Sequence, residues 1–269
     1  MNTRLTKEDQ AMIKEAKGNK VSGPIYNEDG LRLLKVLGNP EYLEVKNGVK
    51  AICDEACLGL DNLHDVVLPA SVTDLGTRAF ASCIKLFKIT MPGVDFIGIE
   101  SFAHCENLKE IALPETLGKI WKGAFADCKA LEETNIPSHL KIIDKSAFRN
   151  SGLKSLNIEI SDGGKCLVYD KAFASCKHLE SVYLNKNVKI LERMAFADCT
   201  SLKTIEFEQP SLTCCAGEIN ATMLIGCTSL EKIIVPKNKY NNYPDFNIQG
   251  FESAQFETRD FNSLITPKE

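Results

Sequence analysis

The chain has 269 residues, of which 44% are hydrophobic and 25% are charged, and its formal net charge at pH 7 is −4. This composition is typical of a soluble folded protein. The 32 basic and 36 acidic residues are interspersed and form no basic stripe, so we expect no nucleic-acid partner. No apolar run approaches the roughly 18 residues that a membrane-spanning helix needs, so we also expect no membrane insertion.

The N-terminal segment carries a helix signal but no export signal. Thr6 and Asp9 form the pattern of a capping box, which predicts a short helix over about residues 7–17 that ends at Gly18. The same segment lacks the apolar core of a secretory signal peptide. We therefore expect a cytoplasmic protein if Met1 is the native start, and a secreted or cell-surface protein otherwise.

A single unit then recurs about seven times, with clear copies at 79–93 (AFASCIKLFKITMPG), 101–115 (SFAHCENLKEIALPE) and 171–185 (AFASCKHLESVYLNK). The phenylalanines that anchor the copies are 22, 23, 23, 25 and 23 residues apart. A period this regular is typical of solenoid proteins. The six anchors are Phe80, Phe102, Phe125, Phe148, Phe173 and Phe196.

Each unit predicts one coil of the solenoid. After the anchor, the pattern L-x-x-I-x-I alternates apolar and polar residues like a half-buried strand, and a proline often ends it because proline cannot donate to a sheet ladder. A second, shorter extended piece precedes the next anchor. No unit can bury its own leucine, isoleucine and phenylalanine side chains, so these must pack against the neighbouring coils. Strands ~4.8 Å apart would give eight coils a length of ~40 Å.

The chain contains eleven cysteines; five of them occupy the third position after an anchor phenylalanine, and Cys227 holds the same position in the last, diverged copy. Metal sites use short paired spacings such as C-x₂-C, and no C-x₂-C pair occurs here. In-register side chains on stacked coils would place Cβ atoms ~4.8 Å apart, whereas a disulfide needs ~3.8 Å. We therefore predict a column of buried, reduced thiols, and leave a redox role open only for Cys214 and Cys215 in the insertion at 208–218. The cysteine column comprises Cys83, Cys105, Cys128, Cys176, Cys199 and Cys227.

No catalytic motif can be assembled from the sequence. The four histidines occupy different repeat positions, so no Ser-His-Asp or Cys-His set follows from their spacing. The Gly-rich insertion SDGGK at 161–165 lacks both the strand–loop–helix context and the G-K-[ST] ending of a phosphate-binding loop. We therefore expect no enzyme activity, no cofactor and no metal site.

The outward positions of the strands form the candidate partner surface. Seven residues after the anchor, the charge alternates from Lys109 to Glu231, which predicts a ladder of surface ion pairs. Phe87 interrupts this column with an apolar ring, and exposed apolar clusters can mark partner sites. Local packing is the alternative role for each candidate residue. The candidates are His64, Phe87, Thr90, Ala112 and Tyr183 on this face, with Trp121 and Tyr169 on the other face.

We expect four segments along the chain. A helical arm at 1–24 precedes a segment at 25–62, which contains a hairpin cap over 25–37 and a degenerate first repeat. The leucine-rich repeats follow at 63–235. The chain then ends in a C-terminal cap and tail at 236–269, whose aromatic residues would cover the last coil.

The combined pattern L-x-x-I-x-I-P, V-x-x-I-G and x-x-A-F-x-x-C resembles the BspA-like (Treponema-type) leucine-rich repeat family over about residues 45–236. The resemblance implies a leucine-rich repeat solenoid with a parallel β-sheet on one face, short extended segments and turns on the other, and a cap at each end. It also implies a binding or adhesion role. The copy at 146–158 departs from the pattern, since it lacks the cysteine and is one residue shorter before its leucine.

These patterns leave three hypotheses for function. The first is a non-catalytic, monomeric scaffold that presents the outward face of the solenoid to a protein partner. The second is a secreted or surface adhesin of the same fold that binds a host or matrix protein. The third is a cysteine-based redox or metal protein, which thiol titration with metal analysis would distinguish from the other two.

Overall fold

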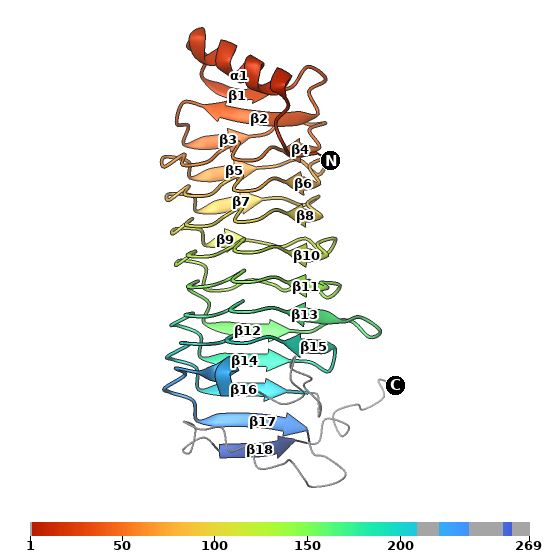
Figure 1. Cartoon of the computed structure of the whole chain (residues 1–269), viewed down its shortest axis with the longest axis vertical. Helices are drawn as coiled ribbons and strands as arrows, with labels where there is room; N and C mark the ends of the chain where they lie inside the picture. The colour runs from red at the N-terminus through yellow and green to blue at the C-terminus, as the bar shows by residue number, and fades with distance from the viewer. Residues whose placement is uncertain (1, 209–220, 237–254, 260–269) are drawn as a thin grey trace.

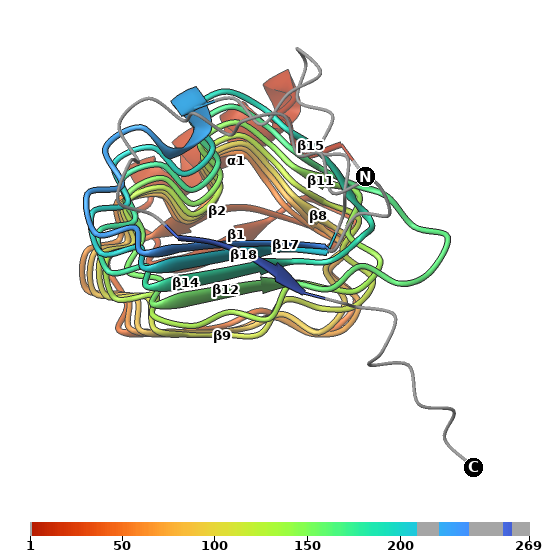
Figure 2. The same cartoon turned by 90° about the horizontal axis from the view of Figure 1, so that it is seen from below.

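The computed structural model describes residues 2–208, 221–236 and 255–259 of the chain. Successive coils stack into an elongated solenoid, with helix α1 at its N-terminal end (Figure 1). Viewed along the long axis, the coils superpose around one continuous hydrophobic core (Figure 2). The parallel β-solenoid predicted from the repeat is therefore confirmed.

A helix and a hairpin cover the N-terminal end of the solenoid. Helix α1 (Lys7–Gly18) begins with the predicted capping box, in which the Thr6 hydroxyl accepts from the Asp9 amide and the Asp9 carboxylate accepts from the Thr6 amide. Strands β1 (Gly23–Tyr26) and β2 (Arg32–Leu37) pair antiparallel. The predicted helix and hairpin are both confirmed.

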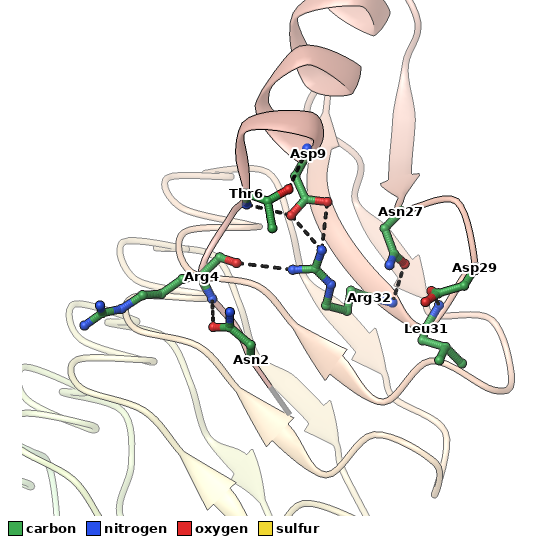
Figure 3. Close-up of polar contacts among 8 residues, drawn as sticks. All are labelled: Asn2, Arg4, Thr6, Asp9, Asn27, Asp29, Leu31 and Arg32. Atoms are coloured by element: carbon green, nitrogen blue, oxygen red, sulfur yellow. Dashed lines mark hydrogen bonds and ion pairs between the residues drawn. The ribbon is translucent and has the colours of Figure 1, made fainter.

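A buried ion pair fastens α1 to the hairpin (Figure 3). The Arg32 guanidinium donates to both oxygens of the Asp9 carboxylate, at 2.7 and 2.8 Å, and Asp9 is only 3% exposed. Arg32 also donates to the main-chain oxygen of Arg4 at 3.2 Å. Ile13 of the helix and Leu34 of β2 belong to one hydrophobic cluster. Packing and charge together hold the helix over the first coil.

The outward face of the solenoid consists of two parallel sheets. The first contains β3 (Tyr42–Glu44), β5 (Asp65–Val67), β7 (Lys88–Thr90) and β9 (Glu110–Ile111). The second contains β12 (Ser155–Ile158), β14 (Ser181–Leu184), β16 (Thr204–Phe207), β17 (Lys232–Pro236) and β18 (Gln255–Arg259). Residues 131–137, between β9 and β12 in the chain, form no strand, so the outward face is interrupted at that coil.

The short extended pieces of the coils form a sheet of their own on the opposite face. They continue from hairpin strand β2, and every pairing after the hairpin is parallel. A 3₁₀-helix, η1 (Ala221–Leu224), takes the anchor position in the last coil. The strands are β4 (Ala51–Ile52), β6 (Asp74–Leu75), β8 (Phe96–Ile97), β10 (Lys119–Ile120), β11 (Ile142–Ile143), β13 (Cys166–Val168) and β15 (Val188–Leu191).

The six anchor phenylalanines form a single stack through the core. All six are fully buried, and neighbouring rings lie nearly parallel with their centroids 5.1 to 5.5 Å apart. Each coil contributes one ring, so the stack runs along the axis on which the coils are stacked. The prediction that these residues form the core is confirmed.

The cysteine column is buried and reduced, as predicted. All the cysteines in the described residues are free and buried, whereas Cys214 and Cys215 lie outside those residues. Each thiol of the column also donates to a main-chain oxygen of the preceding coil at 3.1 to 3.2 Å, as Cys105 does to Phe80. Burial raises the pKa of the Cys83 thiol to about 12, so it stays protonated and unreactive.

Candidate functional site

An aromatic pair occupies the N-terminal part of the outward face. The ring of Phe87 is half-buried because it stacks on the exposed His64 imidazole of the preceding coil, with the ring centroids 5.4 Å apart. His64 Nδ1 in turn lies 2.8 Å from a carboxylate oxygen of Asp65. His64, rather than the N-terminal cap, therefore shields part of the Phe87 ring.

Two pairs of the predicted charge ladder, Glu132–Lys154 and Glu180–Lys203, form along the same face, and Lys88 pairs with Glu110 in the adjacent column. The paired side chains are exposed, so water screens their attraction and each pair adds little to stability. Their main effect is to neutralise neighbouring charges on the face. The pairs between successive coils are Lys88–Glu110 at 2.8 Å, Glu132–Lys154 at 2.6 Å and Glu180–Lys203 at 2.9 Å.

Tyr183 lies on β14, in the second sheet of the outward face. Its hydroxyl donates to the Glu208 carboxylate at 3.4 Å. Partial burial, together with the negative charges of Glu208 and Glu159, raises the pKa of Tyr183 to about 12. Because Phe87 directly precedes β7 of the first sheet, the partner surface predicted between Phe87 and Tyr183 crosses the interruption at residues 131–137.

Two polar residues explain that interruption. Thr134 occupies the core-facing strand position that Ile89 holds in β7 and Ile111 holds in β9. Asn135 follows it, and its side-chain amide donates to the Leu113 main-chain oxygen at 2.8 Å and accepts from the Leu113 amide at 3.0 Å. A side chain therefore uses the main-chain groups that the next strand would otherwise pair.

The interruption opens a hollow of about 890 Å³ on the outward face. Residues from four successive coils line the hollow, and Thr90 and Ala112, both exposed, are the predicted site residues among them. The hollow also takes in Lys109, Thr134 and Asn135, which the sequence analysis did not single out. The sequence signal for this position was a Thr-Asn pair in a strand pattern that is otherwise apolar at alternate residues.

The hollow also leaves part of the core uncovered. Ile111 is only half-buried and lines the hollow, whereas equivalent residues in intact strands, Ile89 and Ile205, are 3% and 0% exposed. Apolar surface in contact with water costs roughly 25 cal/mol per Å² relative to burial. A partner that covers Ile111 would therefore gain free energy from this surface.

Trp121 and Tyr169 lie away from the hollow. They directly follow β10 and β13, strands of the sheet on the opposite face. Trp121 is half-buried, since Lys119 Nζ lies 3.2 Å from its ring centroid and the Phe96 ring lies 5.4 Å away on the preceding coil. Its indole Nε1 is buried without a hydrogen-bond partner in the described residues. These contacts give Trp121 a packing role.

The remaining candidate features yield no further site in the described residues. No group of three or more His, Cys, Asp or Glu side chains in that part of the chain is arranged to hold a metal ion. None of its helices has the length and apolarity that crossing a membrane requires. In the 161–165 insertion, Asp162 pairs with Lys186 at 3.0 Å. The 208–218 insertion after residue 208, and most of the 236–269 segment, lie outside the described residues.

Comparison with known proteins agrees with this architecture. The leucine-rich repeat protein of Treponema pallidum is 23% identical, with a TM-score of 0.50 over 78% of this chain and 88% of that one. A leucine-rich cell surface protein of Faecalibacterium prausnitzii is 20% identical, with a TM-score of 0.40 over 79% and 86% of the two chains. The pneumococcal vaccine antigen PcpA is 17% identical, with a TM-score of 0.43 over 89% and 83%.

At the level of sequence, no curated protein matches significantly. A family model does match, in six copies over residues 50–163 and 167–265, and its description is the BspA type leucine-rich repeat region. This match covers most of the chain. The repeat, whose phenylalanine and cysteine columns form the core, extends over the same part. The chain therefore belongs to the BspA-type leucine-rich repeat family.

Proposed function

We propose that the chain is a non-catalytic scaffold that binds a protein partner on its outward face, over the hollow. The observation that carries this proposal is the interruption at residues 131–137, which opens about 890 Å³ across four coils and uncovers Ile111. A regular stack of coils would have covered this apolar surface. The exposed residues Thr90 and Ala112 are small and give a partner close access to it.

The chemistry of the described residues favours binding over catalysis. The cysteine thiols of the described residues are buried in the core, and burial raises the pKa of Cys128 well above its ordinary value. His64 faces solvent, and its contacts are the Phe87 ring and the Asp65 carboxylate rather than a serine or cysteine. Among the charged residues that line the hollow, Lys88 and Glu110 form an ion pair with each other.

A matched pair of substitutions tests the proposal. The immobilised full chain is used to capture a partner, which is identified by mass spectrometry, purified and titrated against the variants. Ala112→Arg places a long charged side chain in the hollow, while Ala70→Arg makes the same change at an exposed residue outside it. We expect Ala112→Arg to weaken binding at least tenfold and Ala70→Arg to leave it within twofold.

The melting temperatures of both variants serve as the folding control. Equal binding by wild type and Ala112→Arg, with unchanged melting temperatures, would show that the hollow is not the binding site. In that case the aromatic pair at Phe87 and the 208–218 insertion become the next surfaces to test.

A further inference from the structure

We infer that the hollow binds a linear segment of the partner in an extended conformation, held by main-chain hydrogen bonds and carrying little net charge. This inference rests on the proposed function and specifies the kind of partner surface that the hollow fits. Four features support it: unpaired main-chain groups, the dimensions of the hollow, its floor and its balance of charge.

The first feature is a run of unpaired main-chain groups. In the regular coils, main-chain hydrogen bonds join successive coils. The Lys109 amide donates to the Phe87 main-chain oxygen, and the Glu180 amide donates to the Lys154 main-chain oxygen. At the interruption, the amides of residues 132–136 donate to no acceptor in the described part of the chain. Main-chain amides and carbonyls are strong hydrogen-bonding groups, and an extended peptide offers complementary groups at a matching spacing.

The second feature is size. A peptide that bonds to the amides of residues 132–136 must run parallel to the strands, and in the coil of β7 the hollow is lined by residues 88–92. An extended chain rises ~3.3 Å per residue, so about five peptide residues would lie along the hollow. Its volume of about 890 Å³ is in the range of pre-formed ligand sites.

The third feature is a floor that lets a main chain approach closely. Thr90 and Ala112 have short side chains, and Ile111 between them supplies apolar surface. The Asn135 side-chain amide is hydrogen-bonded to the Leu113 main chain. It therefore prevents a strand from pairing there and does not fill the hollow. A bulky folded surface would contact only the rim, whereas a single extended segment can reach Ile111.

The fourth feature is the balance of charge. Glu110 is neutralised by Lys88, and Glu132 by Lys154. The lining charges that have no ion-pair partner among the described residues are Lys109, Glu115 and Glu133, one positive and two negative. The hollow therefore offers no net positive field for a polyanion such as a nucleic acid, and a nearly neutral peptide fits it best.

The experiment first selects peptides that bind the full chain and then measures their binding to a variant in which the missing strand is restored. A phage library of linear nine-residue peptides is selected on the full chain, and a selected sequence is synthesised and titrated. The double variant Thr134→Ile/Asn135→Thr copies Ile89 and Thr90 of β7 and so restores an ordinary strand at the interruption. We expect this variant to melt at a higher temperature than wild type and yet to bind the peptide at least tenfold more weakly.

N-methylation of the peptide tests the main-chain bonds directly. Methylating successive amides should reduce affinity at least tenfold at some positions and less than twofold at their neighbours, because alternate amides of an extended chain point to opposite sides. Ala70→Arg should leave peptide binding within twofold. The inference is overturned if no peptide is selected, if the double variant binds as tightly as wild type, or if no N-methyl group weakens binding.

Two outcomes separate this inference from the proposed function. If a captured partner binds in a manner sensitive to Ala112→Arg, but none of its linear segments binds, the extended-peptide inference fails and the scaffold function stands. If the hollow instead holds a second copy of this chain, sedimentation will show a dimer that Ala112→Arg dissociates, and this result also overturns the inference. If Ala112→Arg affects nothing, both proposals fail.

Discussion

Replacing Phe125 by alanine tests whether the stack of anchor rings holds the coils together. Phe125 is fully buried and lies between Phe102, at 5.3 Å, and Phe148, at 5.1 Å. Removing a buried phenylalanine costs about 3–5 kcal/mol through lost burial and the cavity that remains. Two lost ring contacts, each of about 0.5–1.5 kcal/mol, place the expected loss toward the upper end of that range.

The assay is urea unfolding of the full chain. Trp121 is the only tryptophan and lies four residues before Phe125, so its fluorescence reports on the coil that is changed. Circular dichroism reports on the whole solenoid, and coincident curves would justify a single free energy of unfolding. Ile84→Ala is the control, because Ile84 is 43% exposed and its loss should cost under about 0.5 kcal/mol. A loss below about 1 kcal/mol for Phe125→Ala would refute the stacking argument.

The cysteine column should react with a thiol reagent only after unfolding, since its thiols are buried; peptide mapping that finds Cys105 or Cys128 labelled in the native protein would contradict this. Asp9→Asn should destabilise the protein by about 1–3 kcal/mol at neutral pH, because it removes the partner of the Arg32 charge, whose side chain is only 13% exposed. Burial opposes ionisation of Asp9, but hydrogen bonds from the Thr6 amide and Arg32 outweigh it and hold the pKa of Asp9 below its ordinary value. The stabilisation is therefore present above about pH 4 and is lost as the pH falls through the lowered pKa of the folded state, so the melting temperatures of wild type and variant should converge in acid; a constant difference would count against the ion pair. The Thr134→Ile/Asn135→Thr variant should raise the free energy of unfolding by about 1 kcal/mol in urea titrations, and a decrease would mean that the interruption has another cause. Phe87→Ala should weaken binding of a captured partner without moving the melting temperature if the partner extends to the N-terminal part of the face; unchanged binding would confine the partner to the hollow.

The regular part of the fold could be predicted from the sequence because its determinants recur at a fixed spacing. Each coil carries the same phenylalanine, cysteine and leucine positions, and stacking is the one arrangement that buries them all. The capping box of Thr6 and Asp9 is equally local, since both residues belong to a single helical turn. The predicted core, reduced thiols and N-terminal helix followed directly from these patterns.

The candidate site could be predicted only in part. Thr90 and Ala112 were singled out as outward residues, and the hollow brings them together with Ile111. Trp121 and Tyr169 were singled out because such side chains are common in binding sites, but Trp121 packs against Lys119 and Phe96 on the opposite face. Residue type alone does not reveal which neighbours from other coils a side chain contacts.

The sequence by itself therefore determined the solenoid, its core columns and its N-terminal cap, because periodic burial needs no information beyond the repeat. Only the tertiary structure decided where the outward sheet breaks and what replaces the missing strand. Hydrogen bonds between coils join residues more than twenty positions apart, so the Asn135 side chain can substitute for a strand only once stacking has placed it beside Leu113. The two-residue strands of the opposite face depend on stacking for the same reason, since each is too short to be specified by its own residues.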